Sequence, residues 1–118
     1  MKYVFDIDGT ICSNTDGNYE RAEPMLERIK KINELYSKGH KIMFMTARGM
    51  GRYKNNRSRV YEEFYDFTFN QLKKWGVKFH ELYLGKPEAD FFIDDKGQWS
   101  EMFFDNKKNL IDDVFDEM

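Results

Sequence analysis

Two carboxylates stand two residues apart at the end of an apolar segment near the start of the chain. The segment, residues 3–10, has the sequence YVFDIDGT. Successive side chains of a strand point to opposite faces, so Asp6 and Asp8 would share a face at a spacing of about 6.5–7 Å. One reacting group can lie between them. An acidic turn is the alternative, because Asp-Gly is a common turn signal, but a turn does not explain Asp6 at the edge of an apolar run.

Three further segments with strand-like patterns are followed by polar residues that suit the same site. These residues are, in chain order, Thr46 after segment 41–45, Lys86 after segment 82–84, and Asp94 with Asp95 after segment 91–93. The carboxyl ends of parallel strands lie along one edge of a sheet, where ligands bind. We therefore expect a pocket of four carboxylates, one hydroxyl and one ammonium. Carboxylates this close repel one another, and a divalent cation relieves that repulsion.

A phosphoryl group beside such a cation accounts for the remaining residue types. Its oxygens need the metal, a lysine charge and hydroxyl or backbone donors, while one carboxylate attacks phosphorus and another moves a proton. The chain holds two histidines and one cysteine, too few soft ligands to favour zinc. Oxygen donors favour magnesium instead.

Periodic patterns predict the elements that carry these residues. Apolar residues at helical spacing predict one helix from Pro24 to just before Gly39 and another from about Ser58 to Gly76. The first strand is expected to be buried on both faces. Strands that alternate with helices predict right-handed βαβ units. We expect an α/β fold, a Rossmann-like three-layer sandwich with a mostly parallel sheet, in one domain over residues 1–118.

The end of the chain has weaker patterns. They predict an edge strand near residues 102–104 and a short helix from Lys108 onward.

Composition limits the classes of protein to which this chain can belong. A hydrophobic content of 41% with 34% charged residues indicates a folded chain in contact with water. No apolar run is long enough to cross a membrane and no leader pattern precedes the first strand, so a cytoplasmic location is expected. The single Cys12 fits a reducing compartment and, without a partner base nearby, is expected to be a small semi-buried thiol. A net charge of −2 offers no global attraction to nucleic acid.

The ordered motifs resemble those of the haloacid dehalogenase (HAD) superfamily of phosphohydrolases. The resemblance covers about residues 1–97 and rests on DIDGT at 6–10, Thr46 within FMTAR, Lys86 within GKP, and the pair Asp94 and Asp95. It implies that Asp6 is the nucleophile that forms an aspartyl-phosphate. It also implies that Asp8 protonates the leaving oxygen and later activates water. An acidic residue at that position is typical of the superfamily's phosphatases and phosphomutases rather than its transport ATPases.

The same resemblance implies the ligand contacts. Thr46 and Lys86 would hold the phosphoryl oxygens, with Ala47, Gly9 and Thr10 as further phosphate-binding candidates. Magnesium would be held by Asp6, by the main-chain carbonyl of Asp8 and by one of the pair Asp94 and Asp95. The sequence leaves open which member of that pair touches the metal.

Superfamily cap domains have no room in this chain. They occur soon after the first motif or between the second and third, and residues 11–23 and 47–85 are too few for one. The site is therefore expected to be open, for bulky substrates or for cover by a neighbouring subunit in a homo-oligomer. The closest resemblance is to a bacterial group associated with capsular polysaccharide synthesis, which implies a sugar phosphate or another small phosphometabolite as substrate.

Residues 48–59 carry five basic residues and no acidic one. Because this segment leaves the sheet directly after Thr46, we expect Arg48, Arg52 or Arg57 to bind a second anionic or hydroxyl-rich part of the substrate. A solvated basic surface loop is the alternative.

Two other functions stay open. One is a phosphatase of nucleotides or nucleic-acid ends. The other is a non-catalytic phosphoacceptor or phosphate-binding regulatory domain, such as a signalling receiver. Receivers resemble this chain in length and in using Asp, Thr and Lys, but their lysine follows the second acidic group, whereas Lys86 precedes Asp94. The order favours the phosphatase.

Overall fold

A computed structural model describes residues 1–105 of the chain. The chain divides into two compact units, Met1–Glu88 and Ala89–Met118. The helix predicted from Lys108 onward lies outside the described residues.

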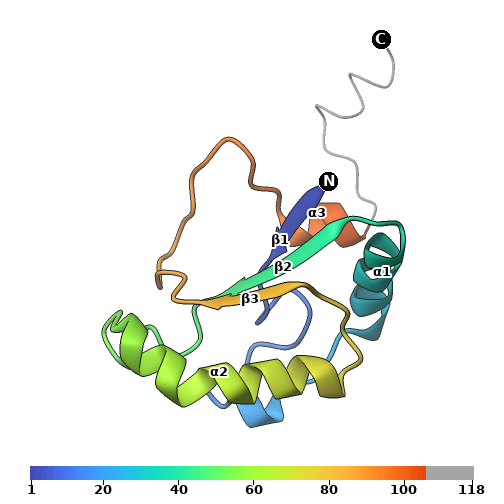
Figure 1. The fold of residues 1–118 in the computed structure, drawn as a ribbon. Coiled ribbons are helices and arrows are strands. Elements are labelled where there is room, and N and C mark those ends of the chain that lie inside the picture. The colour runs from blue at the N-terminus through green and yellow to red at the C-terminus, as the bar shows by residue number, and fades with distance from the viewer. Residues whose placement is uncertain (106–118) are drawn as a thin grey trace. The chain divides into compact units, whose positions relative to one another are not determined.

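The first unit is a parallel sheet with helical crossovers (Figure 1). Its strands pair in the order β1-β2-β3, and Phe44 pairs with Phe5 on one side and Leu82 on the other. A helix connects each pair of neighbouring strands, so the predicted Rossmann-like α/β class is confirmed. The elements are β1 (Lys2–Phe5), η1 (Tyr19–Arg21), α1 (Leu26–Ser37), β2 (Lys41–Thr46), α2 (Arg57–Lys74) and β3 (Glu81–Leu84).

The two predicted helices of this unit are confirmed with small changes at their ends. Helix α1 begins two residues after Pro24 and stops before Gly39, whose φ of 93° ends the helix. Helix α2 begins after Asn56, whose side-chain oxygen accepts a hydrogen bond from the N–H of Arg59. It stops before Gly76 in the same way.

One face of the sheet forms the core and the other does not. Phe5, Phe44 and Leu82 are buried, whereas Val4 is 60% exposed and Tyr83 43% exposed. The prediction that the first strand is buried on both faces is therefore wrong. Right-handed crossovers in the order β1-β2-β3 place both helices on the same face. A layer on the opposite face would have to come from outside this unit, so the three-layer arrangement stays a prediction.

Two predicted strands of the second unit are wrong. Residues 91–93 are exposed and lie in no strand. Residues 102–104 belong to a helix, α3 (Ser100–Phe104). A short apolar run looks the same in a strand and in a buried helix segment, and periodicity alone does not separate them. No helix of the described residues is long and apolar enough to cross a membrane.

Candidate functional site

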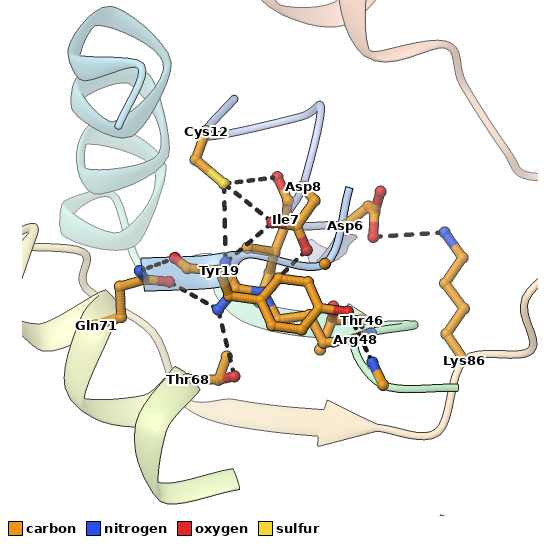
Figure 2. A network of polar contacts seen from close by, with 12 residues as sticks. Asp6, Ile7, Asp8, Cys12, Tyr19, Thr46, Arg48, Thr68, Gln71 and Lys86 are labelled. Atoms are coloured by element: carbon orange, nitrogen blue, oxygen red, sulfur yellow. Dashed lines mark hydrogen bonds and ion pairs between the residues drawn. The ribbon is translucent and has the colours of Figure 1, made fainter. Parts of the chain in front are cut away.

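The carboxyl edge of the sheet brings together four of the predicted site residues (Figure 2). Asp6 follows β1, Thr46 ends β2, and Lys86 comes two residues after β3. The ammonium of Lys86 lies 3.7 Å from Oδ1 of Asp6, and its main-chain N–H donates to the carbonyl of Thr46 at 3.1 Å. Asp8 points away from Lys86 toward another part of the network. The parallel register therefore brings together the polar residues of three of the four predicted strand ends, and the fourth, with Asp94 and Asp95, belongs to the second unit.

The Asp6 carboxylate is the most accessible acid of this group. Its side chain is 34% exposed. Burial raises the pKa of Asp6, and the Asp8 charge raises it further, while Lys86 and a backbone N–H lower it. Desolvation by burial therefore outweighs the stabilising charge of Lys86.

A tight turn after β1 sets the direction of Asp8. The N–H groups of Thr10 and Ile11 donate to the carbonyl of Ile7, and Gly9, at φ 80°, donates its N–H to the carbonyl of Cys12. The side chain of Ile7 is fully buried and anchors the turn. The turn uses the N–H of Gly9, and the role of Gly9 in phosphate binding stays a prediction. Thr10 keeps its hydroxyl, and its role stays a prediction.

Arg48 does not face a substrate. Its side chain is fully buried, and it forms two hydrogen bonds with the Asp8 carboxylate, Nε to Oδ2 at 2.9 Å and Nη2 to Oδ1 at 3.0 Å. Thr46 helps to turn the chain inward, because its hydroxyl oxygen accepts the N–H of Arg48 at 3.2 Å. The prediction that Arg48 binds the substrate is wrong. A buried guanidinium next to a partly buried carboxylate forms a bidentate pair rather than extending into water.

Three residues that sequence reasoning missed surround this guanidinium. Nη1 of Arg48 donates to Oε1 of Gln71 at 2.7 Å and to the hydroxyl of Thr68 at 3.4 Å. The ring of Tyr19 lies 4.8 Å from the guanidinium carbon. Gln71 also donates to the carbonyl of Tyr19 at 2.8 Å, and the Tyr19 hydroxyl accepts the N–H of Gly49. One signal was available: Thr68 is a polar residue on the apolar face of α2, and Gln71 lies three positions further on that helix.

Cys12 packs against the same carboxylate. Its buried thiol lies 3.5 Å from Oδ1 of Asp8. Burial, together with the Asp8 charge, raises the pKa of the Cys12 thiol to about 12. The thiol therefore stays protonated at neutral pH, and the expectation that Cys12 is a packing residue rather than a nucleophile is supported.

Arg52 and Arg57 lie at the surface near this site. Arg57 donates from Nε to the carbonyl of Gly85 at 3.1 Å, directly before Lys86 in the chain. Arg52 donates to the carbonyl of Gly17 at 2.9 Å and lies over the ring of Phe64, 5.3 Å from its centre. Their roles as substrate residues stay predictions.

A pocket of about 580 Å³ lies beside Arg52. It combines three carboxylates, one guanidinium and three aromatic rings. The lining residues are Asp16, Gly17, Asn18, Tyr19, Glu20, Arg52, Glu63, Phe64 and Phe67. Tyr19 lines this pocket, and its ring also lies against the guanidinium that holds Asp8.

The acidic pair Asp94 and Asp95 belongs to the second unit. Oδ1 of Asp94 accepts the N–H groups of Lys96 and Gly97, and these backbone donors lower the pKa of Asp94. The position of this pair beside Asp6, which is in the first unit, stays a prediction.

The described residues contain no group of three or more His, Cys, Asp or Glu side chains that could hold a metal ion. The first unit offers the carboxylate of Asp6 and, as the resemblance implies, the main-chain carbonyl of Asp8. Both are oxygen donors. Magnesium is commonly held by one or two carboxylates with water and substrate phosphate oxygens completing its shell, so this donor chemistry fits it.

The segments in which a cap domain would occur contain only simple connections. Residues 11–23 form a loop with the single turn η1, and residues 47–85 form a loop, helix α2 and strand β3. Neither of these two described segments contains an inserted domain.

Comparisons with known proteins support the fold. The chain is similar to the crystal structure of a structural-genomics target from Vibrio cholerae, with a TM-score of 0.82 and 28% sequence identity over 98% of this chain and 97% of that one. No protein-family model matches the chain, and no curated protein matches it.

Proposed function

We propose that this protein is a magnesium-dependent phosphomonoester hydrolase of the HAD type. The observation that carries the proposal is the convergence of Asp6, Thr46 and Lys86 at the carboxyl edge of the sheet, with Asp8 beside them. An accessible carboxylate paired with an ammonium suits attack on an electrophilic centre that bears negative oxygens.

The reaction has two steps. In the first, an oxygen of Asp6 forms a bond to phosphorus as the bond to the leaving oxygen breaks, and Asp8 gives that oxygen a proton. In the second, Asp8 takes a proton from water, the water oxygen attacks phosphorus, and Asp6 is released as a carboxylate. Lys86 and the hydroxyl of Thr46 stabilise the charge on the phosphoryl oxygens in both steps.

Bound magnesium would offset the phosphoryl charge and orient that group toward Asp6. Asp6 and the Asp8 carbonyl would hold it, together with one of Asp94 and Asp95.

We infer that the substrate is a sugar phosphate or another small phosphometabolite. The pocket beside Tyr19 offers aromatic rings for the apolar face of a sugar and carboxylates that accept hydrogen bonds from its hydroxyls. Its lining has Asp16, Glu20 and Glu63 against the one cation Arg52, a balance that disfavours a polyanion. A phosphatase of nucleotides or nucleic-acid ends is therefore the second candidate.

The test is a phosphatase screen with magnesium over sugar phosphates, nucleotides and 5′- or 3′-phosphorylated oligonucleotides. Asp6→Asn removes the nucleophile and should lower kcat/KM by about 10⁴-fold or more. Asp66→Asn makes the same chemical change at an exposed position of α2 and should leave activity unchanged. Chelation of divalent cations should abolish turnover, and added magnesium should restore it.

Retained activity in Asp6→Asn would contradict the mechanism. If the wild-type protein takes phosphate from a small phosphodonor and keeps it without turnover, it is a phosphoacceptor domain of the regulatory class instead. Preference for oligonucleotide ends over sugar phosphates would select the second candidate.

A further inference from the structure

The buried guanidinium of Arg48 is the best-enclosed charged group of the first unit. Its side chain is fully buried, and a buried charge is tolerated only where it is paired and hydrogen-bonded. Here Nε and Nη2 are paired with Asp8, while Nη1 is held by Gln71 and Thr68. The guanidinium therefore has one orientation, and that orientation fixes the Asp8 carboxylate.

The enclosure is built from three separate parts of the chain. Thr68 and Gln71 come from α2, Tyr19 from η1, and Arg48 from the loop after β2. Gln71 ties two of these parts together, because it accepts from Arg48 and donates to the carbonyl of Tyr19. Such a fully bonded network is rigid, so it holds a geometry rather than adapting to a ligand.

Asp6 and Asp8 have different surroundings as a result. The carboxylate of Asp6 faces Lys86 and is partly exposed, whereas that of Asp8 faces Arg48 and is 19% exposed (Figure 2). Each oxygen of a carboxylate has two lone-pair positions. Arg48 uses one on each oxygen of Asp8, and the Cys12 thiol donates to Oδ1. The second position on Oδ2 stays available for a proton that moves to or from the reacting group.

We propose that Arg48, enclosed by Tyr19, Thr68 and Gln71, is the positioning residue of Asp8 and holds its carboxylate in the direction that proton transfer requires. This inference rests on the proposed function. Arg48 itself does not touch the substrate. In the first step, the proton on Asp8 moves to the leaving oxygen as that oxygen keeps the electron pair of the broken bond to phosphorus.

Leaving groups of different basicity separate positioning from binding or folding. An alkoxide needs a proton as it leaves, whereas p-nitrophenolate leaves without one. Arg48→Ala should therefore lower kcat/KM by about 10²–10⁴-fold for alkyl phosphates and by less than about tenfold for p-nitrophenyl phosphate. A loss of folded protein would lower both values equally.

Three more variants sharpen the result. Asp8→Asn should give the same pattern, and adding Arg48→Ala to it should cause no further loss, because both changes remove one function. Arg48→Lys keeps the charge but cannot form the bidentate pair, so it should not restore activity on alkyl phosphates. Arg59→Ala removes an exposed arginine that lies over Tyr53 in the same basic segment and should leave both substrates unchanged.

The outcomes are distinct. Equal losses on both substrate classes in Arg48→Ala, with a raised KM, would overturn the positioning role while the proposed function stands. A wild-type protein without activity on any phosphomonoester would overturn both. If Arg48→Ala does not fold, as judged by far-UV circular dichroism, the same test is made with Gln71→Leu. This variant should show the same leaving-group dependence with a smaller loss of kcat/KM.

Discussion

Asp6 and Asp8 are chemically identical side chains that the tertiary structure places in different surroundings. Asp6 lies beside the ammonium of Lys86, and Asp8 lies between the guanidinium of Arg48 and the thiol of Cys12. Identical carboxylates acquire different roles only through such differences in neighbours and exposure. In the proposed mechanism, these surroundings distinguish Asp6 as the nucleophile from Asp8 as the proton carrier.

Cys12 provides a test at this scale. Because its pKa is raised to about 12 and its side chain is buried, the native thiol should react with Ellman's reagent at pH 8 orders of magnitude more slowly than the thiol of the chain unfolded in guanidinium chloride. Cys12 is the single cysteine, so the signal has one source. Equally fast reaction of the native protein would show that the environment of Asp8 is open.

The same thiol makes stability depend on pH. Its folded-state pKa lies above the ordinary value of 9.0, so its contribution to stability is complete below pH 9 and is lost as the pH rises toward about 12. Urea unfolding between pH 8 and pH 10.5 should show a smaller alkaline loss of stability in Cys12→Ala than in the wild type. An identical alkaline slope in both proteins would contradict the raised pKa.

At the scale of elements, the loop after β2 decides which arginine turns inward. Gly49 has a φ of 77° and donates its N–H to the Tyr19 hydroxyl, which brings the loop against η1 and α2. A Cβ on Gly49 would lie 2.6 Å from the ring of Phe64. The Gly49 N–H binds the same Tyr19 whose ring lies over Arg48, so the turn and the enclosure of Arg48 are one structural feature.

Gly49→Ala should destabilise the protein more than Gly39→Ala. Both glycines have positive φ, and a side chain at such a position costs about 1–2 kcal/mol. Only Gly49 also meets neighbouring atoms, whereas Gly39 has none within 4 Å. Overpacking should add roughly 1–3 kcal/mol in the Gly49 variant. Equal free energies of unfolding for the two variants, measured with urea, would mean that the loop after β2 shifts to accommodate the added methyl group without a loss of stability.

At the scale of the whole molecule, the sheet of the first unit has one packed face. Phe5 is buried and its neighbour Val4 is 60% exposed, as expected where both crossover helices share a side. The absence of a cap between residues 47 and 85 leaves the carboxyl edge without a second domain in that part of the chain. Under the proposed function, substrate selection would come from the loops and from the pocket beside Tyr19, or from a second copy of the chain.

Val4→Ala tests whether the opposite face is covered in solution. At an exposed strand position the change should cost less than about 1 kcal/mol. The same change at buried Val77 should cost about 2 kcal/mol, because it removes buried methyl groups and leaves a cavity. A cost at Val4 as large as that at Val77, measured by chemical denaturation, would mean that a third layer covers this face.

Local patterns in the sequence were sufficient to predict the strands β1 to β3 and the helices α1 and α2. They were also sufficient to predict that Asp6, Thr46 and Lys86 converge. Alternation, helical spacing and the direction of parallel strands depend on near neighbours or on general rules of sheet geometry. The pairing of Arg48 with Asp8, the positions of Tyr19 and Gln71, and the one-sided burial of β1 were decided by the tertiary structure. Each depends on which distant side chain fills the space beside it. A buried charge takes the partner that packing provides, and that partner is 40 residues away in the sequence.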